Sequence, residues 1–267
     1  MTQPAQPLTV SVVVPVKDDA EALARCLRLL AEQTVLPHEV IVVDNGSRDS
    51  SADVAAAHGA LVVPEPAPGI PAAASRGYDS ARGDVIARCD ADSAPPPDWI
   101  EHIVELMSSC PHLDALTGTG RFYDLPRWSA PALRRIYLGS YYVLVHAALG
   151  HTAVWGSNMA LRRRTWEDVR DLVHRDDPEL HDDMDLAFVL GPLRSVRYDR
   201  TLVVGVSGRS LRGSRQIRRR LRRAVRTLQV NWRVAPPWVR WRTRIGIGLT
   251  HASTRWRARS CRTWVAG

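Results

Sequence analysis

The chain has 267 residues, of which 45% are hydrophobic, so it can bury the core of one large α/β domain, which excludes a disordered or fibrous chain. Its four cysteines are scattered without a zinc-type spacing, and the N-terminus lacks the regions of a signal peptide, so we expect a cytoplasmic chain. The net charge of +8 is uneven: residues 201–267 hold 17 arginines and no acidic residue, whereas residues 1–200 hold 19 basic and 28 acidic residues. A basic tail on an acidic body suggests an anionic partner, such as a diphosphate, a lipid head group or a nucleic acid.

Strand-like and helix-like segments alternate over the first 120 residues. Apolar, β-branched runs predict strands over 8–16, 38–44, 60–65 and 84–90. Helical spacing and capping signals predict helices over 18–34, 51–59 and 96–110, the last with prolines in its first turn, and a loop and helix over 69–83. Repeated β-α units imply a mainly parallel sheet, in which ligands bind beyond the carboxyl ends of the strands.

The second half of the chain is less regular. Residues 136–161 contain no Asp, Glu, Lys or Arg, which is long enough for a membrane span. Glycine, serine and histidine interrupt this stretch, so we favour a buried helix near 130–148 followed by a strand near 153–161. Arginines surround an apolar stripe between 211 and 232, which predicts a basic amphipathic helix; the stripe is Ile217, Leu221, Val225, Leu228 and Trp232.

Polar residues follow three of the predicted strands, at 15–19, 44–47 and 90–92, and the topology brings these strand ends to one crevice. Asp90 and Asp92 stand two residues apart, so on an extended chain their carboxylates point the same way. Such a pair suits a hard divalent cation, Mn²⁺ or Mg²⁺, that keeps coordination sites for phosphate oxygens. The alternative is a capping and turn role, and the same spacing recurs at Asp183 and Asp185.

Five segments carry a resemblance to a known family when they are taken in order: VSVVVPVKDDAEALARCLRLLAEQT, EVIVVDNGSRDSS, GDVIARCDADSAPPPDW, GSNMALRRRTWEDV and HDDMDL. Together they resemble the family 2 glycosyltransferases over residues 8–200. The resemblance implies the GT-A fold, a three-layer α/β architecture with a mainly parallel central sheet. It implies a domain over 1–205, with a nucleotide-sugar-binding half (1–120) and an acceptor and catalytic-base half (121–205), and it leaves 206–267 as a basic helical extension rich in arginine and tryptophan.

The resemblance also implies a reaction, namely the inverting transfer of a sugar from a nucleotide-diphosphate sugar, most often a UDP-sugar, to an acceptor hydroxyl. Asp92 resembles the main ligand of the divalent cation, with Asp90 beside it. Asp44 resembles the carboxylate that recognises the base of the nucleotide. The full set of positions that resemble the nucleotide-sugar site is Pro15, Val16, Glu21, Asp44, Ser47, Arg76, Asp90 and Ala91.

Asp182 and Asp183 stand where the family has Glu-Asp, so Asp183 resembles the catalytic base. An inverting transfer needs a base, and the crowding of Asp182, Asp183 and Asp185 raises at least one carboxyl pKa in the direction that a base requires. The alternative is a helix N-terminus, where acids complement the dipole. The segment Gly156-Ser157-Asn158 is either a loop that lines the acceptor or sugar pocket or a turn into a strand.

The sequence departs from the family at two places. Val16-Lys17-Asp18 stands where the family usually has Thr-Tyr-Asn. Ala74 stands where an arginine often approaches the diphosphate, and Arg76 is offset from it by two positions, on a different helix face. We expect Arg209 or Arg212 to contact the diphosphate instead.

The basic tail has three interpretations: an interfacial helix on an anionic membrane at the inner face, nucleic-acid binding, which is disfavoured because no binding module is visible, or helices packed on the acidic body. The membrane interpretation would suit a lipid-linked acceptor. Two other functions remain open for the whole chain. One is a sugar nucleotidyltransferase, although the Gly-rich basic loop typical of that class is missing, and the other is a non-catalytic scaffold that binds a membrane or a nucleic acid.

Overall fold

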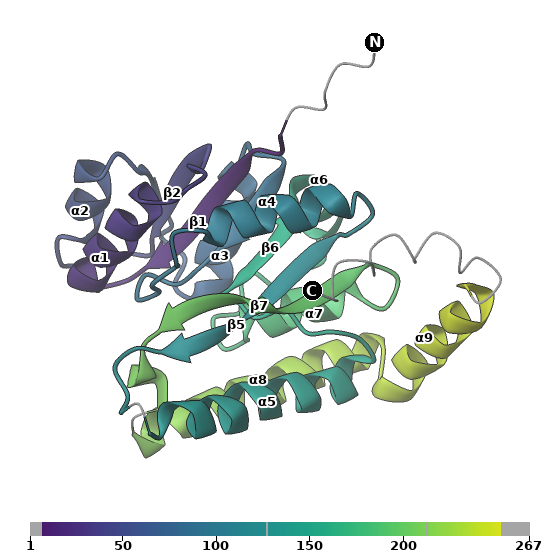
Figure 1. Ribbon diagram of the computed structural model, residues 1–267. Helices are drawn as coiled ribbons and strands as arrows, with labels where there is room; N and C mark the ends of the chain where they lie inside the picture. Colours follow the sequence, from purple (N-terminus) through teal and green to yellow (C-terminus); the bar gives the residue numbers. More distant parts are fainter. Residues whose placement is uncertain (1–6, 127, 212, 252–267) are drawn as a thin grey trace, which may run out of the picture.

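A computed structural model describes residues 7–126, 128–211 and 213–251 (Figure 1). The strands are β1 (Val10–Val16), β2 (Glu39–Asp44), β3 (Leu61–Pro64), β4 (Val85–Arg88), β5 (Ala115–Phe122), β6 (Met159–Arg162) and β7 (Val196–Val206). The helices are α1 (Ala20–Ala31), α2 (Ser51–Ala57), α3 (Ile70–Ser80), α4 (Trp99–Ser109), α5 (Ala130–Leu149), α6 (Arg163–Val169), α7 (Asp182–Leu190), the 3-10 turn η1 (Gly208–Leu211), α8 (Ser214–Val234) and α9 (Pro237–His251).

The strands form one seven-stranded sheet in the order β3-β2-β1-β4-β6-β5-β7. Neighbours among β3, β2, β1 and β4 are parallel, as are β5 and β7, and β6 runs antiparallel between β4 and β5. The apolar strands bury both of their faces. Residues of α1, α2 and α4 pack on one face and residues of α3, α6 and α7 on the other. The predicted three-layer α/β fold with a mainly parallel sheet is therefore confirmed.

Several element boundaries differ from the sequence prediction by a few residues, and two of them are described here. The helix expected from residue 96 begins at Trp99, so the three prolines precede α4 instead of forming its first turn. The strand expected over 153–161 is shorter, because a turn closed by the Asn158 N–H and the Trp155 carbonyl delays β6 until Met159. The helix expected near 130–148 is α5. Within the described ranges, no helix is both long enough and apolar enough to span a membrane.

Helix α8 packs on α7 through buried polar contacts. Thr227 Oγ1 accepts a hydrogen bond from the His181 N–H at 3.0 Å, and the Asn231 side chain donates to Asp185 at 2.8 Å. Arg226 pairs with Asp177 on the adjacent loop. In its described part, the basic extension thus packs on the acidic body; residues 252–267 lie outside the described residues.

Helix α9 is anchored by the buried Arg240, which donates to the carbonyls of Leu149 and Phe188 at 2.8 and 2.9 Å. Arg240 also lies 3.2 Å from His151 Nε2, while His151 Nδ1 lies 2.9 Å from the Thr152 carbonyl. An arginine can only donate, so His151 Nε2 must accept and the ring must be neutral. Burial and the charge of Arg240 lower the pKa of His151 from 6.5 to about 4.

This histidine predicts a loss of stability in mild acid. Between pH 6.5 and 4 the unfolded chain binds a proton that the folded chain excludes, so the free energy of unfolding falls as the pH falls, by about 2 kcal/mol at pH 5. His151→Gln keeps a donor and an acceptor and should remove this part of the pH dependence. Urea unfolding at pH 7.5 and pH 5 measures it, with the exposed His38→Gln as control. An unchanged pH dependence in His151→Gln would contradict the assignment.

Candidate active site

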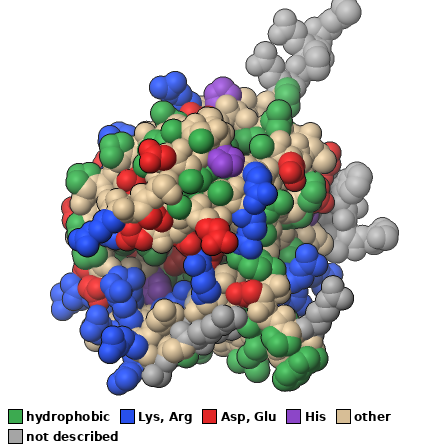
Figure 2. Space-filling model, turned by 90° about the vertical axis from the view of Figure 1, so that its left-hand side faces the viewer, with side chains coloured by type: hydrophobic (Ala, Val, Ile, Leu, Met, Phe, Trp, Pro, Cys, Tyr) green, Lys and Arg blue, Asp and Glu red, His purple; other side chains and the backbone are tan. Residues whose placement is uncertain are grey.

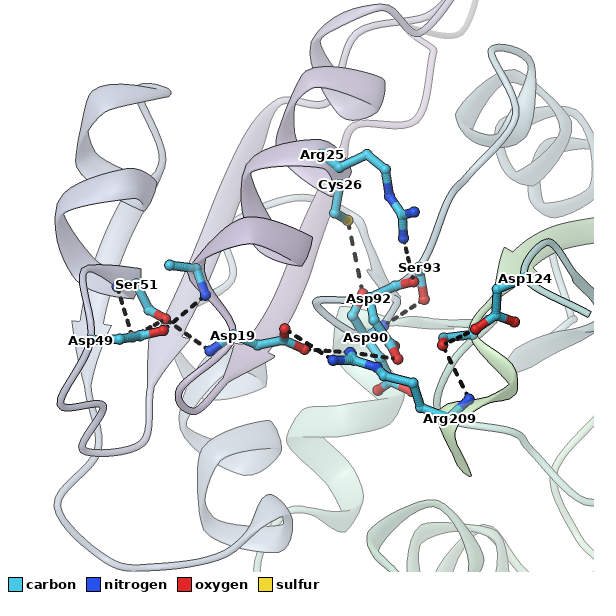
Figure 3. Close-up of polar contacts among 12 residues, drawn as sticks. Asp19, Arg25, Cys26, Asp49, Ser51, Asp90, Asp92, Ser93, Asp124 and Arg209 are labelled. Carbon is cyan, nitrogen blue, oxygen red and sulfur yellow. Dashed lines mark hydrogen bonds and ion pairs between the residues drawn. The ribbon is translucent and has the colours of Figure 1, made fainter. Parts of the chain in front are cut away.

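Loops from both halves of the chain meet at the carboxyl ends of β1, β2 and β4 (Figure 3). Asp18 follows β1, Asp44 is the last residue of β2, and the Asp90–Asp92 segment follows β4. The loop before β6 reaches the same edge, because β6 runs antiparallel to β4 with Met159 opposite Arg88. The N-terminus of α7 and the turn η1 also reach this edge, as the contacts below show, and we call this meeting point of loops the crevice.

Asp90 and Asp92 point in different directions. The Ser93 N–H donates to the Asp90 carbonyl at 2.9 Å and Ser93 Oγ accepts from the Asp90 N–H at 3.0 Å, so the chain turns here instead of staying extended as the sequence suggested. The Asp90 carboxylate accepts from Ser157 Oγ at 2.5 Å, whereas the Asp92 carboxylate accepts from Arg209 at 3.0 Å. The Asp90 carboxylate therefore contacts the loop before β6, whereas the Asp92 carboxylate contacts the turn η1.

Asp92 has the properties of a cation ligand. Burial, followed by the charge of Asp90, raises the pKa of Asp92 above its usual range. Its backbone carbonyl is held by Tyr123 Oη at 2.8 Å and by Arg25 at 3.2 Å, which fixes the turn. Asp19 lies on the other side of the Arg209 guanidinium, 2.5 Å from it. A pair of carboxylates that already holds a cationic group fits a hard divalent cation, although no cluster of three metal-type side chains occurs among the described residues.

Arg88, which the sequence analysis did not single out, joins Asp90 to α7. Its side chain is only 3% exposed, and it forms ion pairs with Asp182 and, at 3.4 Å, with Asp90. Burial raises the pKa of Asp182, and Arg88 opposes this rise. A Cβ at Gly156 would collide with the Arg88 guanidinium, so a larger residue there would push Arg88 away from these partners. The signal for Arg88 was present as one charged residue inside an apolar strand.

Asp183 lies at the first turn of α7 and faces the loop before β6. Its Oδ2 accepts from the Gly156 N–H at 3.0 Å and its Oδ1 from the Met184 N–H at 2.7 Å. Asp182 is bound to Arg88, so the two acids have different environments. Asp183 does lie at a helix N-terminus, as the alternative interpretation expects. Its carboxylate is still partly exposed and faces the crevice.

The predicted base-recognition segment is assembled at the ends of β1 and β2. Pro15 and Val16 pair with Val43 and Asp44 in the parallel register. Asp44 Oδ1 accepts from the Ser47 N–H at 3.0 Å, and Ser47 Oγ accepts from the Asp18 N–H at 3.0 Å. Asp18 has a φ of 52°, in the left-handed region that Asp and Asn tolerate best, which fits its replacement of the family's asparagine.

The other predicted site residues differ in exposure, and their predicted roles stay predictions. Glu21 and Arg76 are exposed on α1 and α3, and the buried Ala74 lines a small cavity beside Asp182. Asn158 is fully buried; its side chain donates to the carbonyls of Thr119 and Leu202 and accepts from Trp99. Ala91 is buried. Arg212 lies outside the described residues.

Comparison with known proteins defines the family. The model of glycosyl transferase family 2 matches residues 11–170, more than half of the chain, so the chain belongs to this family. An undecaprenyl-phosphate 4-deoxy-4-formamido-L-arabinose transferase of Pseudomonas fluorescens is 40% identical over 106 residues, which are 36% of this chain and 31% of that protein. Glycosyltransferase AglE of Haloferax volcanii is 32% identical over 107 residues, 37% of this chain and 35% of that protein. These matches span about a third of each relative.

Solved structures share the fold. Mannosyltransferase PcManGT from Pyrobaculum calidifontis, in complex with GDP-Man and Mn²⁺, has a TM-score of 0.61 at 20% identity, covering 82% of this chain and 61% of that one. Glucosyl-3-phosphoglycerate synthase from Mycobacterium tuberculosis, in complex with Mn²⁺, UDP and glucosyl-3-phosphoglycerate, has a TM-score of 0.56 at 18% identity, covering 84% and 80%. The GT-A fold expected from the sequence is therefore confirmed.

The Arg88 contacts predict a strongly coupled pair. Arg88→Met leaves the Asp182 carboxylate buried without its counter-charge and should lower the free energy of unfolding at pH 7 by about 3 kcal/mol. Adding Asp182→Asn removes the uncompensated charge and should restore a large part of the loss. Urea unfolding of the single and double variants measures this. Arg25→Met, at an arginine whose partners are uncharged, is the control, and a double variant as unstable as Arg88→Met would refute the coupling.

Proposed function

We propose that this chain transfers a sugar from a nucleotide-diphosphate sugar, with UDP as the first candidate nucleotide, to an acceptor hydroxyl with inversion. The observation that carries the proposal is the meeting of Asp92 and Asp183 at one crevice. The Asp90–Ser157 hydrogen bond and the Gly156–Asp183 hydrogen bond connect them through adjacent residues. Asp92 is suited to the diphosphate side of the reaction and Asp183 to the acceptor side. The Mn²⁺ complexes of structural neighbours support a divalent cation.

The reaction follows from the two acids. The acceptor oxygen attacks the anomeric carbon, Asp183 takes the hydroxyl proton as general base, and the bond to the diphosphate oxygen breaks. The N–H groups of Gly156 and Met184 hold the Asp183 carboxylate in position. Asp92, with Asp19 beside it, would hold Mn²⁺ or Mg²⁺, which supplies Lewis acidity for the leaving diphosphate. Asp44 and Ser47 form the proposed base-recognition edge, and Ser157 lines the proposed sugar side.

Asp183→Asn tests the proton acceptor. The amide is nearly the same size but cannot take the proton, so we expect transfer to fall by about 10²–10⁴-fold. Donor binding should persist, measured as thermal stabilisation by UDP-, GDP- and dTDP-sugars with and without Mn²⁺. Asp171→Asn, at an exposed aspartate that follows α6, is the matched control. Normal turnover by Asp183→Asn would refute the assignment of Asp183 as the general base. If no donor stabilises the unaltered protein, the proposed function is refuted.

A lipid-linked acceptor at an anionic membrane is the second part of the proposal. A relative that acts with undecaprenyl-phosphate supports it. So do α5 and α8, which lie side by side and are joined by a hydrogen bond from Arg220 to Tyr137 at 2.6 Å (Figure 1). Both helices expose large apolar side chains: Ile136, Val143, Leu144, Ile217, Leu221 and Val225. Figure 2 shows basic and hydrophobic side chains along the lower edge of the molecule, where these helices lie. Such a mixed surface suits an anionic bilayer.

Leu144→Glu tests this surface. The side chain is 67% exposed, so the substitution should leave the fold intact while placing a negative charge against the lipid. We expect the fraction that floats with phosphatidylglycerol-containing vesicles to fall several-fold. Leu36→Glu, at a 66% exposed leucine on the opposite half of the chain, should float like the unaltered protein. Failure of the unaltered protein to float, or equal loss in both variants, would refute the membrane contact.

A further inference from the structure

The guanidinium of Arg209 occupies the place between two carboxylates that come from distant parts of the chain (Figure 3). It lies 2.5 and 3.2 Å from the oxygens of Asp19, at the start of α1, and 3.0 Å from Asp92 Oδ2. Asp19 and then Asp92 raise the pKa of Arg209 above its usual range, so its charge is constant at any pH of interest. The carboxylates thus already have a cation from within the protein.

The backbone under Arg209 is fixed while its side chain is accessible. Asp124 accepts from Ser207 Oγ at 2.8 Å and from the Gly208 N–H at 2.6 Å, and Ser207 Oγ accepts from the Arg209 N–H at 3.1 Å. A Cβ at Gly208 would lie 2.8 Å from Leu125, so this turn is tightly packed. The Arg209 side chain itself is 52% exposed. Its guanidinium can therefore leave the carboxylates by side-chain rotation, without disturbing the core.

A divalent cation and a guanidinium cannot share one carboxylate oxygen at hydrogen-bond distance without strong repulsion. Arg209 holds Oδ2 of Asp92, and because both oxygens belong to one carboxylate, a cation on either of them would lie close to the guanidinium. A diphosphate would change this balance, because its oxygens can accept the guanidinium bidentately as Arg209 leaves Asp92. Anion and divalent cation would then favour each other's binding.

We propose that Arg209 is the resident counter-cation of the Asp19–Asp92 pair, and that Asp92 binds a divalent cation only after Arg209 has moved from it to the donor's diphosphate. This inference rests on the proposed function and adds the regulation of its cation site. Free Mn²⁺ alone is bound weakly, and the site is loaded when the nucleotide diphosphate arrives. The exchange couples cation and donor occupancy through one side chain.

Binding of Mn²⁺, followed by electron paramagnetic resonance of the free ion, tests the exchange without any turnover. The unaltered protein is titrated with Mn²⁺ alone and with UDP present, beside Arg209→Gln and Arg209→Lys. Removing the resident charge in Arg209→Gln should tighten Mn²⁺ binding without UDP by about tenfold and shrink the gain that UDP brings. Arg209→Lys keeps the charge and should stay close to the unaltered protein. Arg218→Gln, an exposed arginine of α8, controls for the change in net charge.

The outcomes separate the two proposals. Mn²⁺ binding by Arg209→Gln that is equal to or weaker than that of the unaltered protein, without UDP, overturns the exchange while leaving the transferase function standing. Tightening of equal size in Arg218→Gln also overturns it, because net charge alone would then explain the effect. Absence of Mn²⁺ binding in every variant, even with UDP, overturns the cation site itself. Should Arg209→Gln lose its cooperative thermal unfolding, Arg209→Met is titrated in its place under the same criteria.

Discussion

The buried guanidinium of Arg88 is the contact on which the geometry of the crevice depends. It lies inside the sheet, in β4, and pairs with Asp90 on its own strand's extension and with Asp182 at the start of α7. A buried charge of this kind is stable only while its partners stay in place. The position of α7, and with it Asp183, is therefore tied to the turn that carries Asp92. A residue larger than glycine at 156 would press on this guanidinium.

Sheet topology explains why residues far apart in sequence meet there. The parallel strands β1, β2 and β4 deliver Asp18, Asp44 and Asp90 at one edge. Because β6 is inserted antiparallel beside β4, the residues that precede it lie at that same edge, which brings Ser157 to Asp90. The antiparallel strand β6 thus lets the second half of the chain contribute residues to a site that lies at the strand ends of the first half.

Much of the fold could be predicted from the local pattern of apolar and polar residues. Single residues show where this kind of prediction fails. The apolar runs and their helical partners predicted the parallel half and α5, because burial on both faces leaves a clear signature. The turn at Asp90–Ser93 was missed because one serine closes it, and an extended pair was expected. The pairs Arg88–Asp182 and Asp19–Arg209 join residues 94 and 190 positions apart, which no single-sequence periodicity encodes. Arg76 and Glu21 match family positions by spacing. Their side chains are exposed and take no part in the contacts described for Arg88 and Asp19.

The contact between α7 and α8 bears on where the chain can be shortened without leaving buried polar groups unpaired. Asp185 is 2% exposed and receives hydrogen bonds from the His174 N–H and from Asn231 of α8. A polypeptide ending before Ser214 would leave that carboxylate without the Asn231 donor and the His181 N–H without Thr227. The family match ends at residue 170, but the buried contacts of α7 extend to Asn231 of α8. Boundaries for expressing the isolated domain therefore follow from α8 and not from the extent of sequence similarity.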